Sequence, residues 1–469
     1  MPNCKHYAIC GLGSIPGKDL CILHCHNSNK DHREFAEALA EHRKKNGDNF
    51  RHFVFPGPSD FSGATFDTEV DFYDATFTVL ANFSNATFTK RANFLLAKFD
   101  TTAAADFAYA KFNDGAHFTN VNFRSGARFP GVEFTGLVDF SDGKFAKQAD
   151  FSTAKFNGPV GFCETIFCEA KFESTGFTNE VDFFLATFAA RANFFRARFA
   201  DGADFSGASF AHGADFSHSM FLGITLFVPW KQEGKEPHPI FSGIQVDFRD
   251  VIIAPLDAVV FRDADLRKCH FLGTDLRKAE LANVTWPEII SKKWPRIGRR
   301  LGVYDEVWAD QERNNRSRPH IEQLYRQLKQ NYEDRRNYEM ARDFHYGEKE
   351  MRRKNLDNPL SLRLLLKLYC CVSGYGERSL PPLVCAAVLL VASSVAYLGL
   401  GLWSNESKSM LEWSDWLSAL GYSFRVMTLL KPDDLVPIGY AKAVSAAQSL
   451  AGPILLGLFA LALRQRLKR

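Results

Sequence analysis

The hydrophobic positions in the N-terminal half of the chain repeat with an almost fixed spacing. The gaps between successive phenylalanines alternate between five and six residues. The series opens with Phe61, Phe66, Phe72, Phe77, Phe83, Phe88, Phe94 and Phe99. This spacing fits neither the period of about 3.6 residues of a helix nor the period of about two of a flat strand. It fits a chain that turns a corner after each phenylalanine, so we predict a coiled repeat.

Two irregularities interrupt the spacing. Phe99 and Phe107 are eight residues apart, and the run Phe167, Phe172, Phe177 advances by five and five. We expect a bulge at such a position and not a break, because a local insertion or deletion can be absorbed while strand pairing continues.

A second block of repeats follows the first. It keeps a strict five-residue spacing through Phe261, Leu266, Phe271, Leu276, Leu281 and Trp286. The stretch between the blocks, around 230–239, carries proline and lysine and indicates a loop. We therefore place the first block at residues 56–228 and the second at residues 241–287.

Small and polar residues surround the phenylalanines in recurring triplets. Examples are Ala81-Asn82-Phe83, Ala92-Asn93-Phe94, Ala203-Asp204-Phe205 and Ala214-Asp215-Phe216. In these features the chain resembles the pentapeptide-repeat family in its Phe-centred variety. The resemblance implies a mainly β fold, a right-handed quadrilateral β-helix in which the central phenylalanine points inward.

The C-terminal region contains two long uncharged segments. Residues 379–403 and 443–463 are 25 and 21 residues without a charge. Each can cross about 30 Å of hydrocarbon at about 1.5 Å per residue. We predict two transmembrane helices at these positions, in a membrane domain over residues 359–469.

Basic residues flank the two spans on their outer sides. They are Arg363, Lys367 and Arg378 before the first span, and Arg464, Arg466, Lys468 and Arg469 after the second. Fewer basic residues, Lys408, Arg425 and Lys431 among them, lie between the spans. The positive-inside rule then predicts a multi-pass protein of the inner (plasma) membrane with both termini and the solenoid in the cytoplasm. The ten cysteines without a secretory signal agree with a reducing compartment.

An amphipathic stretch with Trp413, Trp416 and Leu417 lies between the spans, and a polar loop follows it. This order resembles the two-span pore module of potassium channels. The resemblance marks as pore-loop-like Thr428, Leu430, Lys431, Pro432, Asp433 and Asp434. The module needs glycines that let successive carbonyls face the ion, whereas leucine, lysine and proline stand at those positions here. Potassium selectivity is therefore not expected. The remaining interpretations of this module are a non-selective channel and a membrane anchor without a pore. The resemblance also suggests a homo-tetramer.

A helical hairpin is predicted between the repeats and the membrane domain, over residues 319–356. Apolar residues recur at helical spacing in its two halves: Leu324, Leu328 and Tyr332, then Tyr338, Ala341 and Phe344. Residues 360–369 are apolar and basic, and we interpret them as an interfacial helix that contacts membrane lipid.

The first 50 residues contain cysteines and histidines spaced like the ligands of a metal site. The candidate ligands are Cys4, Cys10, Cys21 and His24, with Cys25 as an alternative to His24. Four soft ligands within a segment too short for its own core suit a structural, tetrahedral zinc. Reduced thiols or an iron–sulfur cluster are the alternatives. The segment resembles the small zinc-ribbon-like heads of some pentapeptide-repeat proteins, and residues 31–45 should form a short helix after it.

Charge and motifs limit the function classes. The net charge of the 469 residues is +3, and residues 60–221 hold 20 acidic and 13 basic side chains. The chain contains no phosphate-binding glycine loop, His-Glu-x-x-His motif or nucleophile elbow, so we expect no enzyme. We expect a membrane-anchored scaffold or sensor that binds an unidentified cytoplasmic protein. Mimicry of DNA toward a topoisomerase is a further alternative, but the membrane tail argues against a nucleic-acid-related role.

Overall fold

The computed structural model describes residues 3–26, 30–100, 102–230, 240–290, 299–377, 379–404, 409–430 and 435–467. These residues divide into two compact units. One unit comprises Met1–Pro287 with Val303–Trp308, and the other comprises Glu288–Gly302 with Ala309–Arg469.

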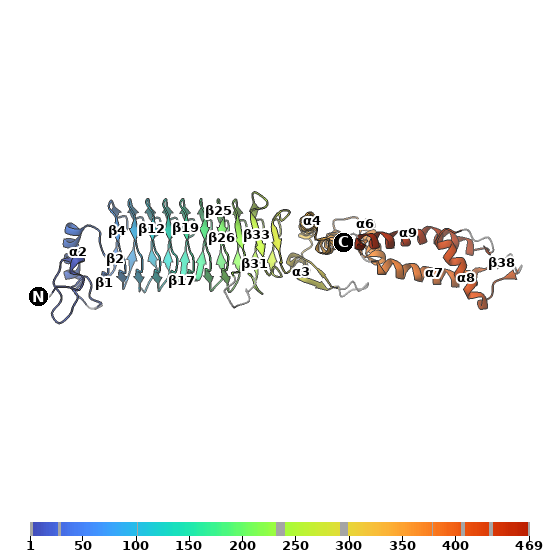
Figure 1. Cartoon of the computed structure of the whole chain (residues 1–469), viewed down its shortest axis with the longest axis horizontal. Helices are drawn as coiled ribbons and strands as arrows, with labels where there is room; N and C mark the ends of the chain where they lie inside the picture. Colours follow the sequence, from blue (N-terminus) through green and yellow to red (C-terminus); the bar gives the residue numbers. More distant parts are fainter. Residues whose placement is uncertain are drawn as a thin grey trace. The chain divides into compact units, whose positions relative to one another are not determined.

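The repeats form a parallel β-solenoid of about ten turns, built from short strands stacked coil on coil (Figure 1). The strands line four faces. The first face consists of β1 (Val54–Phe55), β5 (Thr76–Phe77), β9 (Lys98–Phe99), β13 (Asn122–Phe123), β17 (Lys144–Asp150), β20 (Ile166–Lys171), β23 (Thr187–Phe188) and β27 (Ser209–Phe210). The second consists of β2 (Ser59–Asp60), β6 (Ala81–Asn82), β10 (Ala105–Asp106), β14 (Ala127–Arg128), β24 (Ala192–Asn193), β28 (Ala214–Asp215), β31 (Val246–Asp247) and β34 (Cys269–His270), together with the ends of β17 and β20.

The other two faces are separate sheets. The third consists of β3 (Thr65–Phe66), β7 (Thr87–Phe88), β11 (Lys111–Phe112), β15 (Glu133–Phe134), β18 (Lys155–Phe156), β21 (Gly176–Phe177), β25 (Arg198–Phe199), β29 (Met220–Phe221) and β32 (Ile252–Ile253). The fourth consists of β4 (Val70–Asp71), β8 (Ala92–Asn93), β12 (Ala116–His117), β16 (Val138–Asp139), β19 (Val160–Gly161), β22 (Val181–Asp182), β26 (Ala203–Asp204), β30 (Thr225–Phe227), β33 (Val259–Arg262) and β35 (Glu280–Ala282). Because β30 pairs directly with β33, the two blocks of repeats belong to one continuous solenoid. The loop expected at 230–239 lies, apart from Trp230, outside the described residues.

Ring stacking explains why phenylalanine suits this core. The ring of Phe94 stacks on Phe72 at 4.9 Å and on Phe118 at 4.8 Å, one coil to either side. It meets the ring of Phe83 edge to face at 5.6 Å. Stacked coils are about 4.8 Å apart, which is also a favourable separation for offset aromatic rings. A ladder of identical rings can therefore fill the interior without strain.

The irregular spacings are absorbed without loss of pairing. Between β17 and β20 the register shifts after Phe145, where three residue steps to Gln148 face two steps from Phe167 to Glu169. This bulge confirms the prediction for that region. At the longer gap, the extra residues lie between β9 and β10, and both strands still pair with the coils before and after them.

The N-terminal head contains α1 (Tyr7–Cys10) and α2 (His32–Asn46). Asp31 caps α2, because its Oδ1 accepts hydrogen bonds from the backbone N–H groups of Arg33 and Glu34. Near the other end, the guanidinium of Arg43 lies 5.8 Å from the ring centre of Phe66. The helix thereby covers part of the first coil.

The second unit is mainly helical. Its described elements are β36 (Glu288–Ile290), β37 (Arg299–Leu301), α4 (Arg318–Asp334), α5 (Tyr338–Lys354), α6 (Leu360–Ser373), α7 (Leu380–Leu400), β38 (Leu402–Ser404), β39 (Ser409–Met410), η1 (Trp413–Asp415), α8 (Trp416–Met427), β40 (Leu435–Pro437) and α9 (Ala441–Leu467), and α3 (Tyr304–Gln311) lies at the division between the units. Helices α4 and α5 pack on each other and bury Leu328 and Phe344, whereas Tyr338, which we expected on this face, is exposed. Strands β38, β39 and β40 form a small antiparallel sheet.

Candidate functional site

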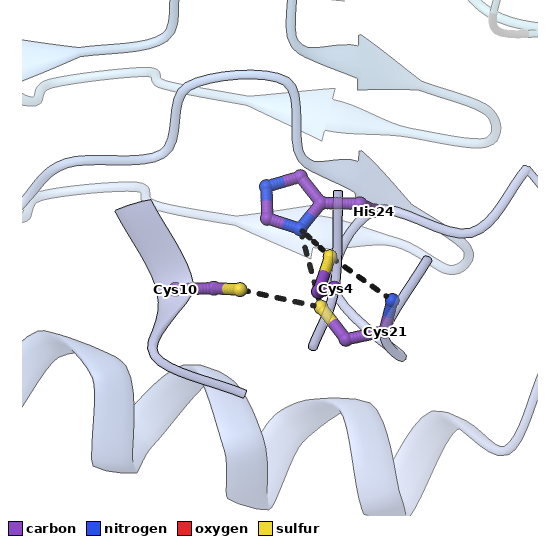
Figure 2. A group of neighbouring side chains, drawn as sticks. All are labelled: Cys4, Cys10, Cys21 and His24. Atoms are coloured by element: carbon purple, nitrogen blue, oxygen red, sulfur yellow. Dashed lines mark hydrogen bonds between the residues drawn. The ribbon is translucent and has the colours of Figure 1, made fainter. Parts of the chain in front are cut away.

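Four buried side chains of the head bring their ligand atoms together (Figure 2). They are Cys4, Cys10, Cys21 and His24, and their sulfur and ring nitrogen atoms all lie within 4.8 Å of one another. Cys10 ends α1, and Cys21 and His24 come from a turn in which the N–H of His24 donates to the carbonyl of Cys21. The fold thus places the expected ligands side by side.

Two of three distances between the ligand atoms match a tetrahedral metal site, and the third is shorter. The Sγ atoms of Cys10 and Cys21 are 3.7 Å apart, and Nδ1 of His24 is 3.6 Å from Sγ of Cys4. Nδ1 also lies 3.2 Å from Sγ of Cys21. Zinc held by sulfur at about 2.3 Å and by nitrogen at about 2.0–2.1 Å, in tetrahedral geometry, separates its ligands by about 3.5–3.8 Å. Three sulfurs and one imidazole are also donors that zinc prefers.

Backbone groups orient these ligands. Nε2 of His24 lies 3.3 Å from the carbonyl oxygen of Arg51, so its N–H can donate there and leave Nδ1 unprotonated for a metal. Sγ of Cys4 accepts hydrogen bonds from the N–H groups of His6 and Cys21, at 3.4 and 3.3 Å. Such bonds favour a thiolate over a thiol.

Burial and hydrogen bonding shift the pKa values of the three thiols in different directions. Burial raises the pKa of Cys4, and the hydrogen bond to Cys10 raises the pKa of Cys21 to about 11. The same bond lowers the pKa of Cys10, as expected for two thiols that share a proton. A metal ion would have to displace these protons, so its affinity should rise with pH.

Two neighbouring residues have other contacts. Sγ of Cys25, the alternative ligand, is buried outside the group of four and accepts a hydrogen bond from Nζ of Lys18 at 3.3 Å. Nζ of Lys30 is buried and donates to the carbonyls of Ile22 and Val54. It therefore connects the turn that carries Cys21 and His24 to β1. Burial lowers the pKa of Lys30 to about 8. Sequence reasoning missed Lys30, because a single lysine in a polar segment carries no signal.

The predicted ladder residues lie in the solenoid core, with one exception. Seven of them are completely buried, namely Phe66, Phe72, Phe77, Phe83, Phe88, Phe94 and Phe99. Phe61 is partly exposed. Its ring stacks on Phe83, and among the described strands β2 pairs with β6 alone, so no earlier described strand continues this face beyond the ring.

The polar residue in the recurring triplets closes a turn. Oδ1 of Asn93 accepts a hydrogen bond from the N–H of Leu95 at 3.1 Å, and Oδ1 of Asp204 accepts one from Ser206 at 2.7 Å. The same bond recurs at Asp60, Asp71, Asn82, Asp106, Asp139, Asp150, Asp182, Asn193 and Asp215. Short polar side chains suit such turns because they satisfy a backbone donor locally. The sequence pattern identifies the triplets but does not indicate this role.

Two helices of the described residues, Leu380–Leu400 and Ala441–Arg464, are long and apolar enough to cross a membrane, and most of each is uncovered within the chain. A buried polar network joins them to α8. The hydroxyl of Tyr397 donates to Oε1 of Gln448 at 2.7 Å, and Nε2 of Gln448 donates to Oγ of Ser423 at 2.6 Å. Oγ of Ser423 in turn donates to the carbonyl of Leu390 at 2.9 Å. The network fixes α8 beside the middle of α7.

Only part of the pore-loop-like segment is described. Thr428 follows α8, and its hydroxyl donates to the carbonyl of Phe424 at 2.9 Å, while Leu430 is exposed. Lys431, Pro432, Asp433 and Asp434 lie outside the described residues. Thr428 therefore acts here as part of a helix end.

The fold defines a parallel β-solenoid, and comparison with known families agrees with it. Residues 50–98 and residues 256–285 each match a family model for pentapeptide repeats. These two segments, one in each block, therefore consist of pentapeptide repeats. No curated protein and no solved structure matches the chain.

Proposed function

We propose that this protein is a membrane-anchored scaffold or sensor whose solenoid binds a protein in the cytoplasm. The observation that carries the proposal is the union, in one chain, of a long pentapeptide-repeat solenoid with two largely uncovered apolar helices. In water such helices would expose extensive apolar surface, whereas in a bilayer their length and their internally paired backbone are suitable. The basic residues outside the two spans favour a cytoplasmic solenoid. The solenoid offers a rigid surface for a partner, and no catalytic role is proposed.

The head is proposed to hold a structural zinc ion. Cys4, Cys10 and Cys21 would bind it as thiolates and His24 through Nδ1. Four protein ligands complete a tetrahedron, so the site would have no position for a substrate or a reactive water. The ion would supply the cohesion that a segment of this size cannot obtain from apolar burial.

A topology experiment tests this arrangement. An epitope tag is placed at each terminus of the full chain, and membranes are prepared as right-side-out and as inside-out vesicles. Protease should remove both tags from inside-out vesicles and neither from right-side-out vesicles. Opposite behaviour of the two tags would contradict a pair of spans, and accessibility only from the outer side would contradict a cytoplasmic solenoid.

A second candidate function, a non-selective ion channel gated by the solenoid, is favoured by the position of α8. The Ser423 hydroxyl bonds to the carbonyl of Leu390, which lies near the centre of α7. If α7 spans the bilayer, α8 re-enters it, and an assembly of copies could enclose a path. Ion flux from liposomes that contain the purified chain distinguishes the candidates, since absence of flux leaves only the scaffold.

A further inference from the structure

Helix α6 carries apolar side chains on two opposite faces. One face packs against α5 and contributes Leu366 and Cys370 to a buried cluster with Tyr346 and Tyr375. The hydroxyl of Tyr346 lies 3.2 Å from Sγ of Cys370 and holds this face in place. The orientation of α6 on the hairpin is therefore fixed by packing.

The opposite face of α6 is a row of exposed leucines. The exposed fractions are 66% for Leu360, 56% for Leu364, 62% for Leu365 and 61% for Leu368. Their spacing of four, one and three residues places them on one side of a helix that turns about 100° per residue. A helix that is apolar on both sides requires cover on both. Nothing among the described residues of this chain covers the leucine face.

Two basic residues lie along one border of this face. Arg363 and Lys367 are one helical turn apart and fall between the buried face and the leucine face. Among the described residues, no ion pair involves either of them, although Nε of Arg363 donates to the backbone carbonyl of Arg353 at 3.4 Å. Leucines that enter a bilayer beside cations that stay at its surface are typical of a helix at an anionic lipid interface.

We infer that α6 lies in the headgroup region of an anionic membrane leaflet, with its leucine face in the lipid. The inference rests on the proposed membrane anchoring and specifies the partner of one element. It favours lipid over a second copy of the chain for two reasons. The leucine row ends shortly before α7, where Leu380, Leu383 and Val384 are exposed at the start of the first candidate span. The positive charges of Arg363 and Lys367, which form no ion pair with the described residues, also complement acidic headgroups.

Photo-cross-linking in proteoliposomes of phosphatidylcholine and phosphatidylglycerol tests the inference. The full chain carries p-benzoylphenylalanine in place of Leu364 in one sample, in place of Val388 of α7 in a second and in place of Tyr338 of α5 in a third. Val388 and Tyr338 are themselves exposed, at 62% and 50%. We expect lipid adducts at positions 364 and 388 and none at 338.

Each other outcome is informative. Lipid adducts at 388 without adducts at 364 would overturn the inference and leave the membrane anchoring intact. Absence of adducts at both positions would overturn the anchoring as well, and cross-links between copies at 364 would identify a second copy as the occupant instead. Arg363→Gln and Lys367→Gln should each reduce the adduct yield at 364 on the order of fivefold in anionic vesicles, and not in pure phosphatidylcholine. An equal loss of adduct yield in anionic and in pure phosphatidylcholine vesicles would contradict a role of these two charges in binding acidic headgroups.

Discussion

Nε2 of His24 lies 3.3 Å from the carbonyl oxygen of Arg51, a residue just before the first strand of the solenoid. This contact joins the candidate metal centre to the repeat domain. It also selects the ring nitrogen that faces the three sulfurs. The head is thus built onto the start of the solenoid, where Lys30 adds a second connection to Val54.

Zinc content is the first prediction. The purified chain should hold one zinc ion per copy, and Cys10→Ser should lose it, because three ligands cannot complete the closed tetrahedron. Cys25→Ser is the matched control and should keep the metal, since its sulfur lies outside the group of four. Elemental mass spectrometry of the purified variants measures the ratio. A wild-type chain without zinc, or a loss caused by Cys25→Ser alone, would refute the assignment.

Removal of a core ring should be costly. The ring of Phe118 is fully buried and stacks on Phe94 and Phe140, so Phe118→Ala should destabilise the solenoid by about 3–5 kcal/mol. Leu137→Ala, at an exposed position, should change stability by less than about 0.5 kcal/mol. Thermal unfolding of the two variants followed by circular dichroism provides the comparison. Similar midpoints for both would contradict the stacked core.

The periodic part of the structure could be predicted, and the reasons are physical. A spacing of five and six residues indicates a coiled repeat, and the resemblance to pentapeptide repeats predicted the inward position of Phe94, which is fully buried. The partial exposure of Phe61 did not follow, because it depends on the absence of a preceding coil on its face. The spacing of Cys4 and Cys10 suggested a metal, whereas the choice between His24 and Cys25 depends on how one turn directs two adjacent side chains.

Long-range polar contacts could not be predicted in this way. The bond from Ser423 to Leu390 joins residues of two different helices, and neither residue is unusual in its local sequence. Lys30 likewise acquires its role only when the head folds back on β1. Periodicity reports which face of an element is buried, but it does not identify the partner across an interface.

The turn-closing role of the triplets leads to a third prediction. Oδ1 of Asp204 accepts from the N–H of Ser206, so Asp204→Ala should lower stability by about 1 kcal/mol. Asp204→Asn keeps an acceptor oxygen at the same position and should be close to the wild type. Chemical unfolding of the variants measures both. If Asp204→Asn destabilises as much as Asp204→Ala, the hydrogen bond is not the cause.

Two ionisable groups in the helical unit should give stability an unusual pH dependence. Nε2 of His345 and Oε1 of Glu377 are 4.0 Å apart. Burial lowers the pKa of His345 to about 4, with Lys329 and Lys349 acting in the same direction. Burial raises the pKa of Glu377 to about 7. Both groups are therefore mainly uncharged in the folded protein at mildly acidic pH.

The two effects have opposite signs. The contribution of His345 is present above its ordinary pKa of 6.5 and is lost as the pH falls toward 4, because the unfolded chain then binds the proton more tightly. The contribution of Glu377 is present below 4.5 and is lost as the pH rises through 7. In the wild type the two slopes largely cancel between pH 4.5 and 6.5. His345→Gln should leave stability falling by on the order of 3 kcal/mol as the pH rises over this range, and Glu377→Gln should leave it rising by a similar amount. Thermal midpoints across this range measure the slopes, and a wild-type profile in both variants would contradict the account.

Alkaline carbonate extraction decides whether the two apolar helices tether the solenoid to a bilayer. Membranes from cells that produce the full chain are washed at high pH, which strips proteins held only by charge or by other proteins. The chain should stay in the membrane pellet, because α7 and α9 would lie in hydrocarbon. Its appearance in the supernatant would show that these helices do not span the membrane.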